Sequence, residues 1–192
     1  MKEMEQDSRS VRRTKDKLRQ GLTELLKKKP VKNIKVREIA DLVDINRGTF
    51  YLYYKDIYDL VEQIENEMFE DFYEIVRLKE ANGAPPSPVM TDVFNFLAEN
   101  ADLCLVLMGP NGDLEFVNKL KALVRDRCLY YWTKIYNAKS TKYFEHFYAF
   151  FIYGCIGMFE EWLKTGMKET PEEMADILDK MIMNGVKALE VS

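Results

Sequence analysis

The chain has 192 residues, of which 47% are hydrophobic and 31% charged, and its net charge at neutral pH is −4. This composition supports a buried core and argues against an intrinsically disordered chain. The longest apolar stretch, residues 144–159, is broken by Glu, His and two Gly and is shorter than the roughly 18 to 20 apolar residues of a membrane span. No apolar segment follows the charged N-terminal residues, so we expect no secretory signal, no membrane partner and a cytoplasmic location.

Charge is unevenly distributed along the chain. Residues 9–55 hold fourteen Lys or Arg against five acids, a local balance of +9. Residues 61–192 hold thirteen basic and twenty-two acidic residues, a balance of −9. A basic head on an acidic body is typical of a module that binds a polyanion. A solvated charged surface gives the same count, so charge alone leaves both interpretations open.

Residues 9–28 carry Val and Leu at helical spacing, which predicts a first helix that ends before Pro30. Residues 36–55, VREIADLVDINRGTFYLYYK, then predict two short helices joined by a sharp turn. Ile39, Ala40 and Val43 form the inward stripe of the first short helix, and Ala40 is small enough for the second to cross it closely. This is the pattern of a helix-turn-helix.

The turn and the second short helix have their own signals. Asp44 stands where the backbone must become left-handed, a conformation that Asp tolerates better than most residues with a side chain. Asn46 can cap the following helix through its side-chain amide. This arrangement leaves a small, aromatic and hydroxyl-bearing set near the exposed end of that helix: Arg47, Gly48, Thr49, Tyr51 and Tyr53.

Asp56 resembles the cap of a long fourth helix of roughly 23 residues, which would span on the order of 35 Å and can connect a small head to a larger body. The segment EANGAPPSP, residues 80–88, predicts a loop. Further helical patterns follow with almost no strand signal, and the last helix begins with a capping box at Thr170 and Glu173. We expect these later helices at residues 89–99, 102–108, 114–136, 141–164 and from 170 onward.

The string IADLVDINRGTFYLYYKDIYDL, residues 39–60, resembles the DNA-binding domain of the TetR family of transcriptional regulators. The resemblance covers about the first 60 residues and rests on the helix-turn-helix spacing, the T-F-Y-x-Y-Y end of the recognition helix and the amphipathic helix that follows. More loosely, EEWLKTGMKETPEEMA, residues 160–175, is similar to one branch of that family. The resemblance implies an all-α fold of about nine helices, with a three-helix DNA-binding domain at residues 1–56 and a helical effector-binding and dimerisation domain at residues 57–192.

Roles for individual residues are also implied by the resemblance. Arg47 can bond guanine through its fork, and a contact to phosphate fits it nearly as well. Phe50 and Tyr54 stand at helical spacing, and this spacing, rather than the resemblance, predicts that they pack against the first and fourth helices and do not touch DNA. Residues expected to contact double-stranded DNA are Arg37, Arg47, Gly48, Thr49, Tyr51, Tyr53 and Lys55.

Two positions depart from the family pattern. The lysine usual near the start of the fourth helix is replaced by Ile57, for which Lys55 can compensate. The hydroxyl residue that often caps the second helix is absent, with Lys35 and Val36 in its place. Neither change removes the motif, and whether the two together weaken DNA affinity or alter specificity is left open by the sequence.

The resemblance further implies a homodimer in which the last two helices of each subunit form a four-helix bundle. Gly154 and Gly157 leave flat patches for another helix, and the final helix offers a methionine-rich seam. The same stripes would also fit the core of a single protomer.

The three cysteines, Cys104, Cys128 and Cys155, are odd in number and lie among apolar residues, which favours buried reduced thiols over a metal site.

A small-molecule effector would need an apolar cavity between the middle helices, with His146 or Trp132 as a polar group. Each aromatic residue among the candidates also suits plain core packing. The residues expected to line such a cavity are Phe94, Leu103, Leu107, Phe116, Tyr131, Trp132, His146, Phe147 and Phe151.

The sequence therefore predicts a sequence-specific, ligand-responsive repressor that binds a palindromic operator as a dimer and needs no cofactor. An accessory interaction protein with the same fold and weak DNA binding is the alternative. An enzyme ranks third, since the sequence lacks a Gly-rich phosphate loop, a nucleophile-base pair and a metal cluster.

Overall fold

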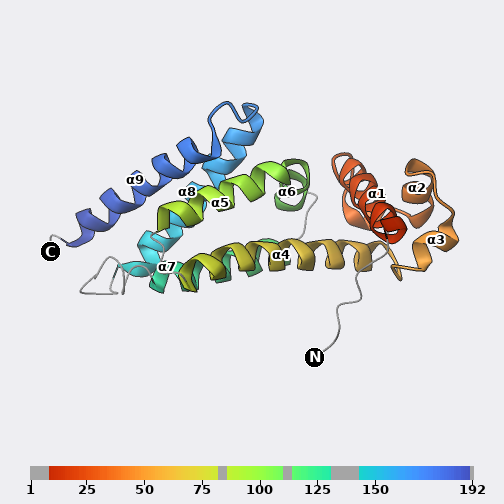
Figure 1. Ribbon diagram of the computed structural model, residues 1–192, viewed down its shortest axis with the longest axis horizontal. Helices are drawn as coiled ribbons and strands as arrows, with labels where there is room; N and C mark the ends of the chain where they lie inside the picture. The colour runs from red at the N-terminus through yellow and green to blue at the C-terminus, as the bar shows by residue number, and fades with distance from the viewer. Residues whose placement is uncertain (1–8, 82–85, 110–113, 131–142, 191–192) are drawn as a thin grey trace. The chain divides into compact units, whose positions relative to one another are not determined.

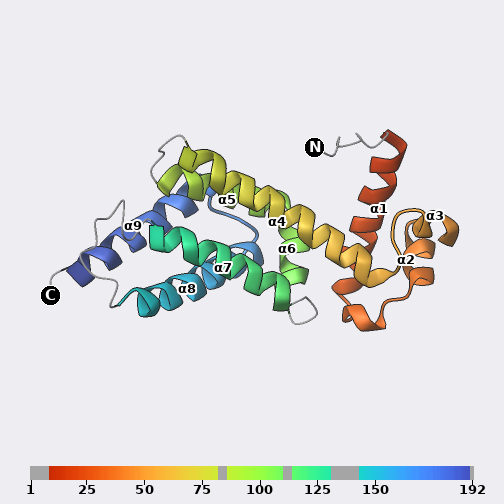
Figure 2. The same ribbon diagram turned by 90° about the horizontal axis from the view of Figure 1, so that it is seen from below.

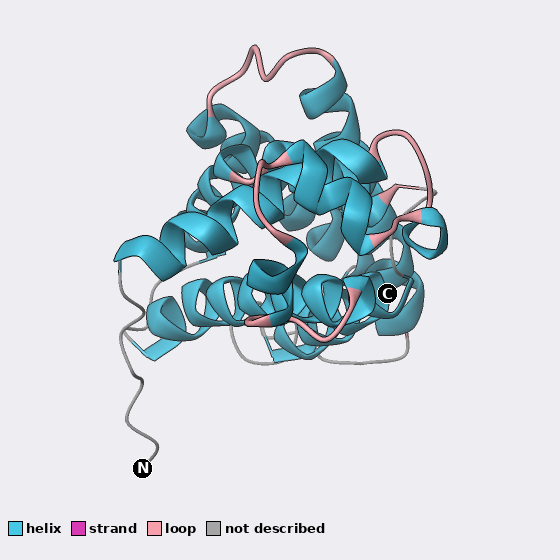
Figure 3. Ribbon diagram, turned by 90° about the vertical axis from the view of Figure 1, so that its right-hand side faces the viewer, coloured by secondary structure: helices cyan, strands magenta, loops and turns pink. Residues whose placement is uncertain are grey.

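A computed structural model describes residues 9–81, 86–109, 114–130 and 143–190. Over these ranges the backbone forms nine α-helices and one short 3-10 helix with no strand, which confirms the predicted all-α class (Figure 3). The helices are α1 (Arg9–Leu26), η1 (Val31–Asn33), α2 (Val36–Leu42), α3 (Arg47–Tyr51), α4 (Ile57–Ala81), α5 (Pro86–Glu99), α6 (Ala101–Met108), α7 (Leu114–Tyr130), α8 (Phe144–Lys164) and α9 (Pro171–Glu190).

The helices group into two compact units. Unit 1 contains the described residues up to Met68 together with those of 106–113, and unit 2 contains 69–105 and the described residues from Leu114 onward. In Figure 1, unit 1 is recognised by α1, α2, α3 and the beginning of α4. The domain boundary expected at residues 56 and 57 stays a prediction, because it falls at the start of α4 whereas the compact units divide inside that helix.

Unit 1 is held together by apolar side chains from α1, α2, α3 and α4. Leu18 and Leu22 of α1, Ile39 of α2, Phe50 of α3 and Leu60 of α4 are each fully buried. Their burial follows from the 3.6-residue period of the sequence, which places these positions on one face of each helix. α1, α2, α3 and the first half of α4 thereby each contribute buried residues to unit 1.

Gly21 permits the close approach of α1 and α2. A Cβ atom at this position would lie 2.5 Å from Cγ1 of Val43 and 3.3 Å from Cγ1 of Ile39. Real Cβ atoms do not come so close to a neighbouring carbon, so any larger residue would push the two helices apart. The helix-turn-helix therefore packs against α1 at Gly21, where a residue with a side chain would not fit.

Unit 2 pairs its helices lengthwise. α5 packs along α9, and α7 lies beside α8 in an antiparallel arrangement (Figures 1 and 2). Phe94 of α5 meets Trp162 of α8 edge to face, with ring centroids 5.5 Å apart. A second cluster is centred on Phe72, Val76 and Val89, and its partly buried neighbours are Met90, Val93, Phe96, Leu120, Leu123 and Val124.

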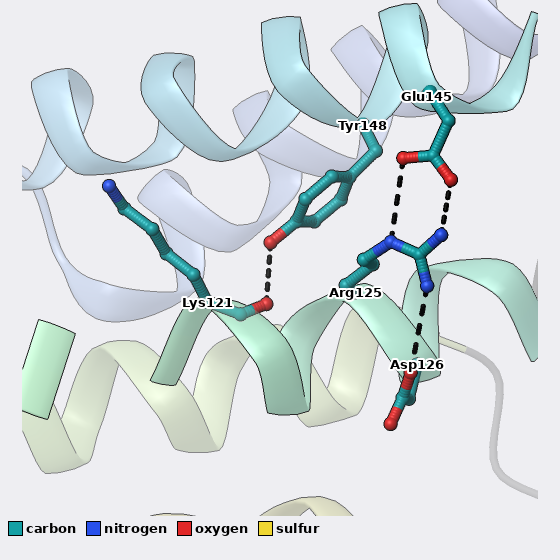
Figure 4. Close-up of polar contacts among 5 residues, drawn as sticks. All are labelled: Lys121, Arg125, Asp126, Glu145 and Tyr148. Carbon is teal, nitrogen blue, oxygen red and sulfur yellow. Dashed lines mark hydrogen bonds and ion pairs between the residues drawn. The ribbon is translucent and has the colours of Figure 1, made fainter. Parts of the chain in front are cut away.

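Polar contacts fix α7 against α8 (Figure 4). The Arg125 guanidinium forms a two-pronged ion pair with Glu145 and lies 3.9 Å from a carboxylate oxygen of Asp126. The Tyr148 hydroxyl donates to the Lys121 carbonyl oxygen, and burial raises the pKa of this phenol to about 12, so it remains a donor at neutral pH. The bonds from Arg125 to Glu145 and from Tyr148 to Lys121 join residues far apart in sequence and set the register of the two helices.

The turn between α8 and α9 uses left-handed backbone at two consecutive residues, Gly166 (φ 85°) and Met167 (φ 51°). The Met167 amide donates to the Trp162 carbonyl oxygen at 2.8 Å. After the turn, the Glu173 amide donates to Thr170 Oγ1 and the Thr170 amide donates to the Glu173 carboxylate, which confirms the predicted capping box. The local sequence therefore dictates a sharp reversal between these helices.

None of the described helices is long and apolar enough to cross a membrane.

Candidate nucleic-acid interface

The predicted helix-turn-helix is present as α2, a turn at residues 43–46, and α3. Asp44 in this turn has φ of 54°, as its predicted left-handed role requires, and the next amide, that of Ile45, donates to the Ala40 carbonyl oxygen at 3.0 Å. Asn46 caps α3, since its Oδ1 accepts from the Gly48 amide at 2.8 Å. Both local predictions for the turn are confirmed.

One side of α3 is buried and the other faces solvent. Phe50 is fully buried and Tyr54 nearly so, with their ring centroids 5.6 Å apart, as expected for packing residues. Arg47, Gly48 and Tyr51 are exposed. Thr49 and Tyr53 are half-buried, so all five predicted contact residues of α3 and its C-terminal turn keep part of their surface in solvent.

Arg37 and Lys55 lie on either side of α3 in the sequence and have exposed side chains. Arg37 of α2 forms only a surface ion pair with Asp41, at 3.5 Å, and such pairs contribute little to stability. Its guanidinium can therefore turn to a phosphate at small cost. The Lys55 amide donates to the Asp59 carboxylate at 2.7 Å, a bond that fixes the turn into α4 and is the main cause of the lowered pKa of Asp59.

The N-terminus of α2 is capped differently from the family pattern. The Lys35 ammonium group has no acceptor, so it cannot bond the first amides of the helix. Instead, the Glu38 carboxylate accepts from the Lys35 amide at 2.9 Å and from Lys29 Nζ at 2.6 Å. The bond from Lys29, followed by the one from Lys35, holds the pKa of Glu38 below its usual value. Sequence reasoning missed this clamp, although Glu at the third helical position is a known signal for it.

Ile57 and Leu52, which flank the end of the helix-turn-helix, differ in exposure. Ile57 is buried at the start of α4, so it supplies packing and no donor where the family has lysine. Leu52, which ends α3, is 76% exposed and was not among the predicted contacts. Its position two residues from the buried Phe50 could have identified it, because a helix turns by about 200° over two residues.

The candidate effector residues fall into different environments. Phe147 and Phe151 stack on α8 with parallel rings 6.1 Å apart, and the Phe147 ring lies against Gly185 of α9. His146 is exposed, so the structure does not bring its side chain into the apolar set. Buried candidates are Phe94, Leu103 and Leu107, whereas the Phe116 side chain and all of Tyr131 and Trp132 lie outside the described residues.

The cysteines have the environment of inert thiols. Cys104 is buried, and burial raises the pKa of both Cys128 and Cys155 to about 12. A protonated thiol is a poor nucleophile and a poor metal ligand. Within the described ranges, no group of three or more His, Cys, Asp or Glu is arranged to hold a metal ion.

Comparison with known proteins decides the family. A family model of the TetR type, TetR_C_8, described as a transcriptional regulator C-terminal region, matches residues 85–184, which is just over half of the chain. The chain belongs to the TetR family of transcriptional regulators. This family is one of regulators and not of enzymes.

Individual relatives of this TetR-family protein agree with the assignment. It is 34% identical over 53 residues to an uncharacterized HTH-type transcriptional regulator, YxbF, of Bacillus subtilis strain 168, and the match covers 28% of this chain but only 14% of that protein. Its fold is similar to a TetR transcriptional regulator from Streptococcus agalactiae 2603V, with TM-score 0.62, 17% identity, and 91% and 96% of the two chains covered. It is also similar to the fatty acid degradation regulator FadR from Bacillus halodurans, with TM-score 0.63, 15% identity, and 89% and 97% covered. At these identities the two solved structures show a shared fold alone.

Proposed function

We propose that this TetR-family regulator is a ligand-responsive repressor that binds a palindromic operator as a homodimer. The observation that carries the proposal is the outward side of α3, where Arg47, Gly48 and Tyr51 are exposed over the buried Phe50. A protein that binds chromosomal DNA acts where that DNA lies, so the proposal includes a cytoplasmic location.

The chemistry of this surface suits the major groove. Positioning on DNA needs groups that bond phosphate, and sequence reading needs groups that reach base edges. Arg47 has the planar fork that matches the O6 and N7 acceptors of guanine. Gly48 lets the backbone approach, and the Thr49 and Tyr53 hydroxyls can donate to phosphate. The excess of Lys and Arg over residues 9–55 supplies the charge that counterion release requires, so binding should weaken steeply with salt.

Dimer formation is supported by the exposed sides of α8 and α9 in unit 2. Phe150 is 82% exposed and Tyr153 66%, and next to them a Cβ atom at Gly154 or Gly157 would meet nothing within 4 Å. On α9, Met181 is also exposed. Large apolar side chains beside open glycines form a self-complementary surface, and a two-fold contact through it would give one dimer two DNA-reading heads.

An effector response is supported by the aromatic interior of unit 2, where Phe94 and Trp162 meet and Phe147 and Phe151 stack. An apolar molecule that separates such rings would alter the packing of α5, α8 and α9. α4 contributes residues to both compact units and runs directly on from the helix-turn-helix, so it is a covalent element through which such a change can reach α3. An effector that binds one conformation of the protein more tightly than another would change the fraction of molecules in the conformation that fits DNA.

The alternative function, an interaction protein with weak DNA binding, is favoured by two observations. Ile57 is buried where the family has a phosphate-binding lysine, and Lys35 cannot cap α2 as a hydroxyl residue would. The exposed Lys55 ammonium, two residues before Ile57, is the group that can replace the missing donor. The proposal therefore requires Lys55 to contribute to DNA affinity.

In the deciding experiment, genomic DNA of the organism that carries the gene is fragmented and passed over the purified protein at two salt concentrations. The fragments that the protein retains are then sequenced. The proposal expects recovery of a shared palindromic site, with retention reduced by Arg47→Ala and Tyr53→Ala. Tyr53→Phe tests the hydroxyl separately, since it keeps the ring. Retention of no fragment even at low salt would refute DNA binding and favour the interaction protein.

A further inference from the structure

Leu52 is the most exposed large apolar side chain among the described residues of unit 1, at 76%, compared with 51% for Leu42, 59% for Tyr51 and 58% for Tyr58. It lies at the C-terminal cap of α3 with helical backbone angles of φ −71° and ψ −24°. Holding a leucine in water in a folded protein forfeits the free energy that its burial would provide. Contact with a partner would recover that free energy, so the side chain is available to bind an apolar group outside the protomer's own core.

The geometry of α3 places Leu52 at the centre of the outward side. Residues four apart share one face of a helix, so Leu52 stands directly one turn after Gly48. Phe50 lies two residues from each of them, about 200° around the axis, and is fully buried. Leu52 and Gly48 thus point opposite to the core, and because Gly48 has no side chain, Leu52 is the group that projects furthest along this line.

The neighbours of Leu52 identify what can cover it. The exposed groups near it in sequence are the cationic Arg47 and Lys55, the hydroxyl-bearing Tyr51 and one acid, Asp56, whose carboxylate is held at the start of α4 because it accepts from the Asp59 amide at 2.9 Å. A protein partner that buried this side chain would have to desolvate these polar groups with it. A polyanion with small apolar spots suits the set better, and DNA has such a spot in its major groove, the 5-methyl group of thymine.

We infer that Leu52 is a specificity-determining residue whose side chain covers the 5-methyl group of a thymine in the major groove. The inference rests on the proposed DNA-binding function and deepens it. Leucine has no donor or acceptor, so it gains from contact with a methyl group and leaves a polar base edge unpaired if it covers one. Arg47 can read guanine by hydrogen bonds, whereas Leu52 would read thymine by exclusion of water, so the two residues act on different bases.

Deoxyuridine tests this directly, since it differs from thymidine only by loss of the methyl group. A fragment recovered from the genomic selection is prepared once with thymine and once with uracil in its place, and both are titrated with the wild type, Leu52→Ala and Leu42→Ala. Leu42 is the matched control because it is also an exposed leucine of unit 1, and its Cδ2 lies near Gly21 on α1 and not on the outward side of α3.

The wild type should bind uracil DNA about fourfold more weakly for each methyl group covered. Leu52→Ala should bind thymine DNA more weakly by a similar factor and lose most of its discrimination between the two DNAs, whereas Leu42→Ala should discriminate like the wild type. The inference is overturned if the wild type binds both DNAs equally, or if Leu52→Ala discriminates as the wild type does.

Leu52→Gln provides a second variant with a side chain of similar length and no apolar end, and circular dichroism shows whether each variant is folded. Leu52→Gln and Leu52→Ala should both lose most of the discrimination between thymine DNA and uracil DNA. If a folded Leu52→Gln discriminates between the two DNAs as well as the wild type does, the inference is also overturned. Failure of the genomic selection to recover any fragment would instead count against the proposed function, so the two failures are distinguishable.

Discussion

The indole Nε1 of Trp162 donates a hydrogen bond to the carbonyl oxygen of Glu169 at 2.9 Å. Trp162 is 3% exposed near the end of α8, and Glu169 lies on the far side of the turn that leads into α9. One side chain therefore packs into the unit 2 core with its ring and closes the turn between the last two helices with its nitrogen. In the proposed dimer, α8 and α9 form the contact surface with the second subunit. The turn sets the angle between these two helices and therefore the shape of that surface.

Trp162→Phe should lower the free energy of unfolding by about 1–3 kcal/mol, because it leaves the Glu169 carbonyl without its donor and removes part of a buried ring. The measurement is denaturant unfolding at one fixed protein concentration, since dimerisation makes apparent stability depend on concentration. Tyr58→Phe, which changes an exposed aromatic residue, is the control and should have little effect. Equal stability of Trp162→Phe and the wild type would refute the structural role of the indole nitrogen.

Gly21→Ala should destabilise unit 1, although Ala is intrinsically the better helix former by about 1 kcal/mol. The new Cβ would lie 2.5 Å from Val43 Cγ1, and overpacking of this kind costs about 1–3 kcal/mol. Gln20→Ala, an exposed neighbour on α1, is the control and should be nearly neutral. Adding Val43→Ala to Gly21→Ala should recover stability relative to the sum of the single changes, and strict additivity in thermal unfolding would contradict the proposed clash.

The stability of the helix-turn-helix should depend on pH through Glu38. Its pKa is lower in the folded protein than the ordinary value of 4.5, because the carboxylate accepts from Lys29 and from the Lys35 amide. A carboxyl group with a depressed folded pKa stabilises the fold above its unfolded pKa and loses this contribution as pH falls through the folded pKa. Glu38→Gln should therefore be less stable than the wild type at neutral pH, with a gap that closes in acid.

Denaturant unfolding of both proteins at a series of pH values below neutrality measures this gap. Glu62→Gln, which changes an exposed glutamate of α4, is the control. A gap between Glu38→Gln and the wild type that stays constant down to the lowest pH would contradict the role given to the carboxylate.

Phe150→Lys should convert the proposed dimer into a monomer. The side chain is 82% exposed in the protomer, so the charge costs the single chain little, whereas an apolar two-fold contact would have to bury two new charges. Sedimentation velocity at micromolar concentration reports the assembly state directly. Leu52→Lys makes the same kind of change on α3 of unit 1 and should remain dimeric, and a wild type that sediments as a monomer would rule out the dimer itself.

Local patterns in the sequence predicted much of this fold, because their causes are local. The left-handed backbone at Asp44, the Asn46 cap and the Thr170–Glu173 capping box each depend on residues within a few positions of one another. The burial of Phe50 and Tyr54 followed from helical period in the same way.

Contacts between segments that are distant along the chain could not be predicted from the sequence. The bond from Lys29 to Glu38 needs the segment between α1 and α2 to fold back on α2, and the pair of Arg125 with Glu145 needs the register of α7 against α8. Neither contact can be predicted from the residue types alone. His146 was expected to be a polar group of a cavity, but its side chain is exposed on α8, a distinction that needs the packing of a whole unit. Whether the effector residues bind a ligand stays a prediction.

The central claim is that the outward side of α3 reads DNA, and the most direct test is the affinity of Arg47→Ala for a fragment recovered by genomic selection. Arg77→Ala is the matched control, because it removes the same charge from α4 at a residue paired only along its own helix with Glu74. Arg47→Ala should lose about 1–3 kcal/mol of binding free energy to the selected fragment, and less to unrelated DNA of equal length, while Arg77→Ala binds like the wild type. Equal affinities of Arg47→Ala and Arg77→Ala for the selected fragment would contradict the account.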